Sequence, residues 1–194
     1  GEVAITRSEY YENEDCAMMQ CLDDRIGCMI IIDSILRDVK NTNDMYYVFT
    51  VQEENGCFGA QTSTFDLQPD LFVTFDVSST GDELRGFRTD VKLGGGAGIK
   101  AMDYFMIVNQ HVVDALVDVA EKNGIKYQIE VSEHGGTDAH TAQFVRGGIK
   151  AGAVIIPTRN IHSRDEIICK EDVLDCIRMA MALETVELDE HFGA

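Results

Sequence analysis

Short apolar segments alternate with helical patterns along this chain, and this alternation is the feature that most constrains its fold. The segments 71–77 (LFVTFDV), 126–131 (KYQIEV) and 151–157 (AGAVIIP) are predicted strands, and 45–52 (MYYVFTVQ) is predicted as a further inner strand. A strand with one face in water alternates apolar and polar residues, whereas these segments are largely apolar throughout. The pattern therefore predicts an α/β fold whose sheet is covered by helices on both faces.

Helical patterns lie between and after these strands. Asp24 is the expected cap of the first helix, and Thr137 or Asp138 lies at the start of the third. The polar opening, residues 1–20, does not resemble the beginning of such a unit, and the chain of 194 residues suits one domain. The predicted helices cover residues 24–40, 111–124, 137–148 and 171–184.

Charge and composition exclude several classes of protein. The formal net charge is −18, from 34 acidic and 16 basic residues, which disfavours nucleic acid as a partner and suits a protein that collects cations. No apolar run is long enough to cross a membrane, so we expect no membrane partner. The six cysteines form no CxxC pair, which favours reduced thiols in a cytoplasmic protein; a cysteine nucleophile is the less favoured alternative.

Acidic and histidine residues stand where several predicted strands or helices begin or end. They are Asp23, the adjacent pair Glu53 and Glu54, Asp76 and His162. Each one alone could be an ordinary cap or loop residue. Together, carboxylates and an imidazole are typical ligands of a zinc, cobalt or manganese site that activates water. In such a site Glu54 would bind metal, while the uncoordinated Glu53 would act as general base.

Five motifs occur in an order that resembles the glutamyl/deblocking aminopeptidases. The motifs are LDDRIGC, VQEENGCFGA, FDV followed by GD, GGTDA and IPTRNIHS. This family consists of dinuclear-metal exopeptidases that often assemble into tetrahedral particles, and some members are labelled endoglucanases. The resemblance implies a zinc-aminopeptidase-like three-layer αβα sandwich with a mixed central sheet. It also implies that residues 21–194 are an incomplete catalytic domain lacking its N-terminal part, and that 1–20 is a remnant of an inserted dimerisation domain with its connecting strand.

The resemblance also implies a role for each motif residue. Asp23 would bridge two metal ions, and a cis peptide would join it to Asp24. The remaining implied roles are metal ligands at Glu54, Asp76 and His162, the general base at Glu53, and substrate contacts at Gly136, Thr137 and Asp138.

The family's upstream His-x-Asp motif has no counterpart here, because no histidine precedes His111. The resemblance implies two divalent ions, which could be zinc, cobalt or manganese. Because this histidine is missing, the second ion is expected to bind weakly. A sheet edge left uncovered is a further expectation.

The expected function is a metal-dependent aminopeptidase that acts on peptides and forms homo-oligomers. A truncated, non-catalytic fragment with an incomplete metal site is the main rival. A glycoside hydrolase is less favoured, because two carboxylates suffice for that chemistry and do not account for His162. The chain also has no tryptophan and only 8% aromatic residues for stacking on sugars.

Overall fold

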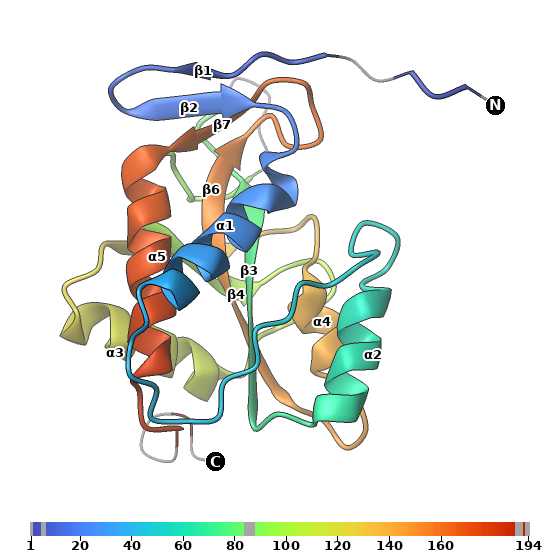
Figure 1. The fold of residues 1–194 in the computed structure, drawn as a ribbon, viewed down its shortest axis with the longest axis vertical. Coiled ribbons are helices and arrows are strands. Elements are labelled where there is room, and N and C mark those ends of the chain that lie inside the picture. The colour runs from blue at the N-terminus through green and yellow to red at the C-terminus, as the bar shows by residue number, and fades with distance from the viewer. Residues whose placement is uncertain (1, 5–6, 84–87, 189–191, 193–194) are drawn as a thin grey trace.

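A mixed β-sheet flanked by helices forms the protein, which confirms the expected three-layer α/β architecture (Figure 1). The structure is a computed structural model and describes all residues except 1, 5–6, 84–87, 189–191 and 193–194. In the described part the sheet has seven strands in the order β1-β2-β7-β6-β4-β5, with β3 paired to β6. The strands are β1 Tyr11–Glu12, β2 Cys16–Met19, β3 Leu71–Ser79, β4 Ala97–Met102, β5 Tyr127–Val131, β6 Lys150–Arg159 and β7 Glu166–Cys169.

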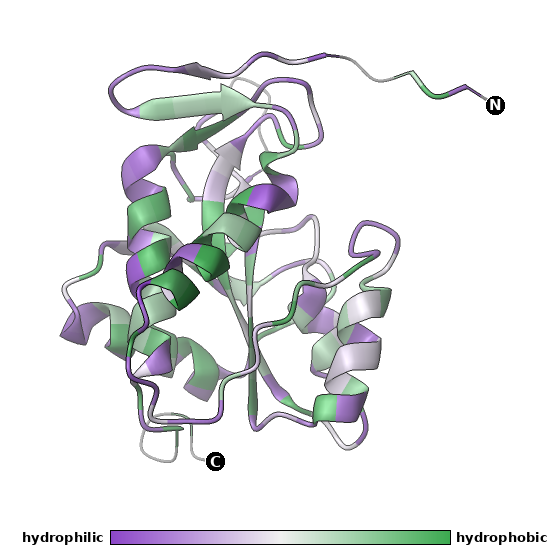
Figure 2. Cartoon of the chain, viewed as in Figure 1, coloured by the Kyte–Doolittle hydropathy of each residue, from purple (hydrophilic) through white to green (hydrophobic). Residues whose placement is uncertain are grey.

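Strand β6 is the centre of the sheet. It pairs in parallel with β3 and antiparallel with β4 and β7. Its residues 151–158 are all buried, which explains why AGAVIIP shows no alternation of apolar and polar residues. Figure 2 colours α3 and α5 in alternating hydrophobic and hydrophilic bands, and the buried core includes Leu116 of α3 and Ile177 and Met179 of α5.

The helices are α1 Leu22–Leu36, α2 Phe58–Leu67, α3 Gln110–Lys122, α4 Asp138–Ala142 and α5 Lys170–Glu184. Helix α1 packs against β3 and α5. Asp23 and Asp24 have non-helical backbone angles, so the regular turns of α1 begin after them. Asp24 Oδ1 accepts a hydrogen bond from Gly27 N at 3.1 Å, as predicted for the cap of these turns. No helix in the described residues has both the length and the apolar character needed to cross a membrane.

Most predicted elements are present. The strands at 71–77, 126–131 and 151–157 and the helices at 24–40, 111–124 and 171–184 are confirmed within a few residues. The helix predicted at 137–148 is much shorter, because the chain turns after Ala142, although Thr137 caps it as expected. Strands β4 and β7 and helix α2 were not predicted, whereas β1 and β2 lie in residues 1–20, where the resemblance implied a connecting strand. Strand β2 pairs with β7 of the main sheet, and the division into residues 1–20 and 21–194 stays a prediction.

The strand predicted at 45–52 is wrong. This segment forms no strand, and Tyr46, Phe49 and Val51 are 61%, 47% and 67% exposed. Aromatic and β-branched residues favour a strand only where a neighbouring strand completes the ladder. A cavity of about 710 Å³ lies between residues 43–50 and β3. Among the described residues β3 pairs with β6 alone, which makes β3 an edge strand; an edge left uncovered by a missing part of the domain stays a prediction.

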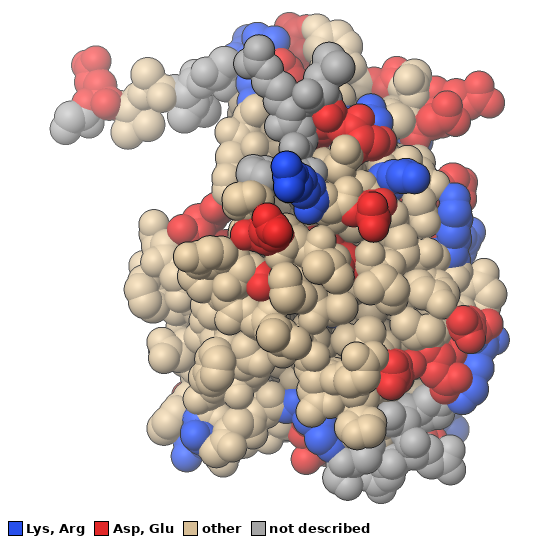
Figure 3. All heavy atoms as spheres, turned by 180° about the vertical axis from the view of Figure 1, so that it is seen from behind, with Lys and Arg blue, Asp and Glu red and all other residues tan. Residues whose placement is uncertain are grey.

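Charge is distributed unevenly over the surface. On the face opposite to that of Figure 1, a broad central area carries neither acidic nor basic side chains (Figure 3). Acidic and basic residues lie mainly around this area. Several acidic residues are buried instead, among them Asp76, Asp138 and Glu166.

Candidate functional site

Asp23 and His162 are held in place by the same buried carboxylate. Glu166, 2% exposed, accepts hydrogen bonds from Leu22 N at 2.6 Å and Asp23 N at 3.1 Å through Oε2. Its Oε1 accepts one from His162 N at 2.9 Å, where the backbone is left-handed with φ 62°. The peptide between Asp23 and Asp24 is cis, as expected from the motif. Two segments far apart in sequence are thereby fixed side by side.

The side chains of Asp23, Glu54 and His162 converge. His162 Nε2 lies 2.9 Å from Asp23 Oδ2 and 3.2 Å from Glu54 Oε2. One donor atom from each residue lies within 4.8 Å of the other two. The sequence analysis named these three residues as metal ligands, and the structure brings them together.

Glu53 lies beside this group on a tight turn. Its carbonyl oxygen accepts hydrogen bonds from Gly56 N and Cys57 N, both at 2.9 Å, so the chain reverses directly after the acidic pair. The turn allows Glu53 and Glu54 to face the same cleft, which a regular strand would prevent. Burial, together with the nearby charge of Asp138, raises the pKa of Glu53 to about 7.

Asp76 lies close to the carboxylates of Asp23, Asp24 and Glu53. It lies on β3, is 6% exposed, and its Oδ1 accepts a hydrogen bond from Val77 N at 2.8 Å. Burial raises its pKa well above the ordinary value, followed by the charges of Asp24 and Glu53. Burial likewise raises the pKa of Asp23 to about 6 and that of Asp24 to about 8.

These carboxylates lack compensating cations. Among the described residues, none of Asp23, Asp24, Glu53 and Asp76 forms an ion pair with lysine or arginine. Closely spaced buried acids are unfavourable when ionised without a counter-charge. Oxygen donors and one imidazole with excess negative charge fit divalent metal ions, as the sequence predicted.

The GGTDA motif borders this group from the other side. Gly136 lines the cleft, which has a volume of about 580 Å³ and also contains Asp23, Glu53, Glu54, Asp76 and His162. A Cβ on Gly136 would lie 2.6 Å from the Phe105 ring, so a larger residue does not fit there. Thr137 is buried as the cap of α4. Asp138 lines the adjoining 710 Å³ cavity and accepts a hydrogen bond from Thr50.

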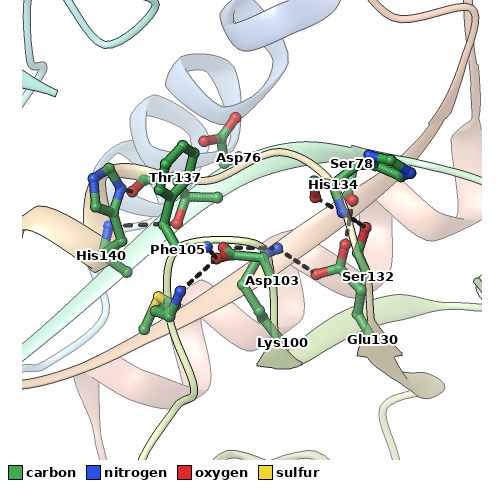
Figure 4. A network of polar contacts seen from close by, with 12 residues as sticks. Asp76, Ser78, Lys100, Asp103, Phe105, Glu130, Ser132, His134, Thr137 and His140 are labelled. Carbon is green, nitrogen blue, oxygen red and sulfur yellow. Dashed lines mark hydrogen bonds and ion pairs between the residues drawn. The ribbon is translucent and has the colours of Figure 1, made fainter. Parts of the chain in front are cut away.

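Lys100 is a cleft residue that the sequence analysis missed. Its ammonium lies 2.7 Å from Glu130 Oε2 and 3.3 Å from Asp103 Oδ2, and all three side chains are at most 3% exposed. Asp103 also accepts hydrogen bonds from the backbone of Phe105 and Met106, and Ser78 donates to Glu130 (Figure 4). This network holds the loop that contains Phe105 in place, and Phe105 forms part of the cleft wall. A lysine within the apolar segment AGIKAM was the signal that could have revealed it.

The arrangement matches a known family. The family model for M42 glutamyl aminopeptidases matches residues 1–179. The chain belongs to this family. A putative aminopeptidase of Acetivibrio thermocellus is 36% identical over 179 residues, covering 92% of this chain and 54% of that protein.

Solved structures agree with this assignment. The TET aminopeptidase of a marine sediment archaeon, Thaumarchaeota archaeon SCGC AB-539-E09, superposes with a TM-score of 0.88 at 31% identity, over 95% of this chain and 54% of that one. The TET1 peptidase of Pyrococcus horikoshii, described as able to assemble into a tetrahedron or a large octahedral shell, gives 0.83 at 28% identity, over 94% and 54%. The M42 chain described here spans about half the length of the curated relatives it matches.

Proposed function

We propose that this protein is a metal-dependent aminopeptidase that removes N-terminal residues from peptides. The observation that carries the proposal is the convergence of Asp23, Glu54 and His162 beside the half-buried Glu53 in one cleft. Membership of the M42 family supports the same reaction class. Peptides are the proposed substrates, and a cytoplasmic location is proposed from the free cysteines.

The proposed metal ligands follow from the donor set. Asp23, Glu54 and His162 would hold one divalent ion, and Asp23 with Asp76 would contribute to a second. The second ion is expected to bind more weakly, because among the described residues no histidine joins Asp76 in a group of closely spaced donor atoms. Zinc, cobalt and manganese all suit these ligands. When bound, such ions activate water and polarise the peptide carbonyl.

Glu53 would supply the proton transfers. Its carboxylate, not needed as a ligand, takes a proton from the attacking water and delivers it to the departing amine. A pKa near 7 places the group close to the point where both gain and loss of a proton are accessible at neutral pH. Phe105 and the buried Lys100 network would form the wall against which the substrate side chain packs.

Homo-oligomerisation is proposed from two observations. The broad uncharged area in Figure 3 is suited to contact with another protein surface. The TET1 relative is described as able to assemble into a tetrahedron or a large octahedral shell.

One rival remains supported by a specific observation. Asp76 belongs to neither group of closely spaced donor atoms among the described residues. A non-catalytic fragment with an incomplete metal site would have this arrangement. A glycoside hydrolase stays the least favoured alternative, because His162 lies within the acidic group.

The test is Glu53→Gln in the metal-loaded protein. We expect hydrolysis of aminoacyl p-nitroanilides to fall by at least about 100-fold, because the general base is lost, while elemental analysis finds unchanged metal content. Glu171→Gln, an exposed acid on α5, is the matched control and should retain activity. A loss of metal with Glu53→Gln would make Glu53 a ligand instead. A metal-loaded wild type that hydrolyses no substrate would favour the non-catalytic rival.

A further inference from the structure

Cys57 lies in an unusual position next to the proposed base. It is 3% exposed, has a left-handed backbone with φ 57°, and immediately precedes α2. Its thiol donates a hydrogen bond to Glu53 Oε1 at 3.4 Å. Its sulfur also lies 3.8 Å from His140 Nδ1, which is 2.8 Å from the carbonyl oxygen of Thr137. The thiol therefore points toward carboxylates rather than into the apolar core.

Asp138 contributes a second carboxylate to the same place. The residue is 5% exposed, and Thr50 donates a hydrogen bond to its Oδ2 at 2.6 Å. Its Oδ1 is buried and lacks a hydrogen-bond partner in the described part of the chain. The Cys57 thiol lies within hydrogen-bonding range of Asp138 as well as Glu53, and its single proton cannot satisfy both carboxylates at once. A buried carboxylate oxygen without a partner is costly, and its presence indicates that a positively charged or proton-donating group belongs there.

The three side chains have the spacing of a metal site. Donor atoms of Glu53, Cys57 and Asp138 lie within 4.8 Å of one another. This group shares no residue with the Asp23, Glu54 and His162 group. Sulfur is a soft ligand that favours zinc over magnesium, calcium or manganese, and two carboxylates complete three of the four positions of a tetrahedral zinc ion.

We propose that Glu53, Cys57 and Asp138 form a separate zinc site that inhibits the protein when occupied. Zinc binding displaces the thiol proton to solvent, forms bonds to the thiolate and to one oxygen of each carboxylate, and leaves a fourth position for water. The bound carboxylate of Glu53 then no longer accepts a proton. The inhibitory effect rests on the proposed function, whereas the binding of metal does not.

Cobalt is the probe that reports on this site without an activity assay. Cobalt bound to a thiolate gives an intense near-ultraviolet charge-transfer band, which carboxylate and imidazole ligands alone do not give. We expect this band when the protein is titrated with Co²⁺, and its loss in Cys57→Ser. Cys28→Ser, a half-buried cysteine on α1, should keep the band, and so should His162→Ala. No band in the wild type at saturation, or a band retained by Cys57→Ser, would overturn the site.

A second variant tests the site independently, in case Cys57→Ser does not fold. Asp138→Asn retains the shape of the side chain and removes its charge, and should raise the cobalt concentration needed for half of the band by about 10-fold or more. An unchanged titration would exclude Asp138 as a ligand.

The inhibitory role is tested with excess zinc on the active enzyme. Wild-type hydrolysis should fall as zinc is added beyond the amount needed for activity, and the fractional inhibition should be smaller in Cys57→Ser. Equal inhibition of both would overturn the inhibitory role, even if the cobalt band is present. Complete inactivity of the wild type would instead contradict the proposed function, and the cobalt band would still decide the metal site.

Discussion

Single buried charged residues hold several segments around the cleft in place. Glu166 binds the backbone of both Asp23 and His162, although it is separated from Asp23 by 143 positions in sequence. The convergence of the proposed ligands could be predicted, because their residue types and motif positions are visible in the chain. Glu166 could not be, because an acid that binds backbone amides across the fold leaves no local pattern. Lys100 is a similar case.

Replacement of Lys100 tests the buried network directly. Lys100→Met leaves Glu130 and Asp103 as buried charges without a counter-charge, and we expect a loss of about 3–5 kcal/mol in the free energy of unfolding. Lys122→Met is the matched control, because its ion pair with Asp118 is exposed and should contribute less than about 1 kcal/mol. Urea denaturation of both variants measures the difference. Equal losses would mean that the network does not stabilise the fold.

Helices and strands with a clear local sequence pattern could be predicted. Whether a segment pairs as a strand with a distant segment could not. Helix α3 and strand β6 follow from local periodicity and from continuous burial. The segment 45–52 has the composition of a strand, yet no strand lies beside it in the described residues. Composition reports the tendency of a segment, whereas pairing is a property of the whole sheet.

The close packing of α1 on β3 depends on Gly27. A Cβ there would lie 2.3 Å from Asp24 Oδ2 and 2.7 Å from the carbonyl oxygen of Phe75. Gly27→Ala should therefore destabilise the protein by about 3 kcal/mol, because the backbone of β3 cannot move away. Gly147→Ala, at a site with open space and an ordinary φ, should change stability by less than about 0.5 kcal/mol. A shift of the thermal midpoint in Gly147→Ala as large as that in Gly27→Ala would contradict this packing argument.

At the scale of the whole molecule, the closely spaced carboxylates of the cleft make the free energy of unfolding depend on pH. The folded pKa of Asp24, about 8, lies above its ordinary value of 3.8, and the pKa values of Asp23, Glu53 and Asp76 are also raised. The folded state then binds protons more tightly than the unfolded state, so the stabilisation is present at low pH and is lost as pH rises toward 8.

Metal-free protein should therefore be less stable at pH 8 than at pH 5.5. The expected difference is on the order of 2 kcal/mol, less than the shift of Asp24 alone would give, because the groups titrate together. Zinc should remove most of this difference by supplying the missing positive charge. Urea midpoints at the two pH values, with and without zinc, give the measurement. A metal-free protein that is more stable at pH 8 would show that these carboxylates are not the dominant charges.

The proposed aminopeptidase reaction depends on Asp23, Glu54 and His162 acting together as a metal site. The most direct test is the number of zinc ions retained per chain after loading and washing, compared between wild type, His162→Ala and His111→Ala. His111 is exposed on α3, away from the cleft, and its loss should leave the count unchanged. We predict that His162→Ala retains at least one ion fewer than the wild type. Equal counts in all three proteins would contradict the assignment of this site.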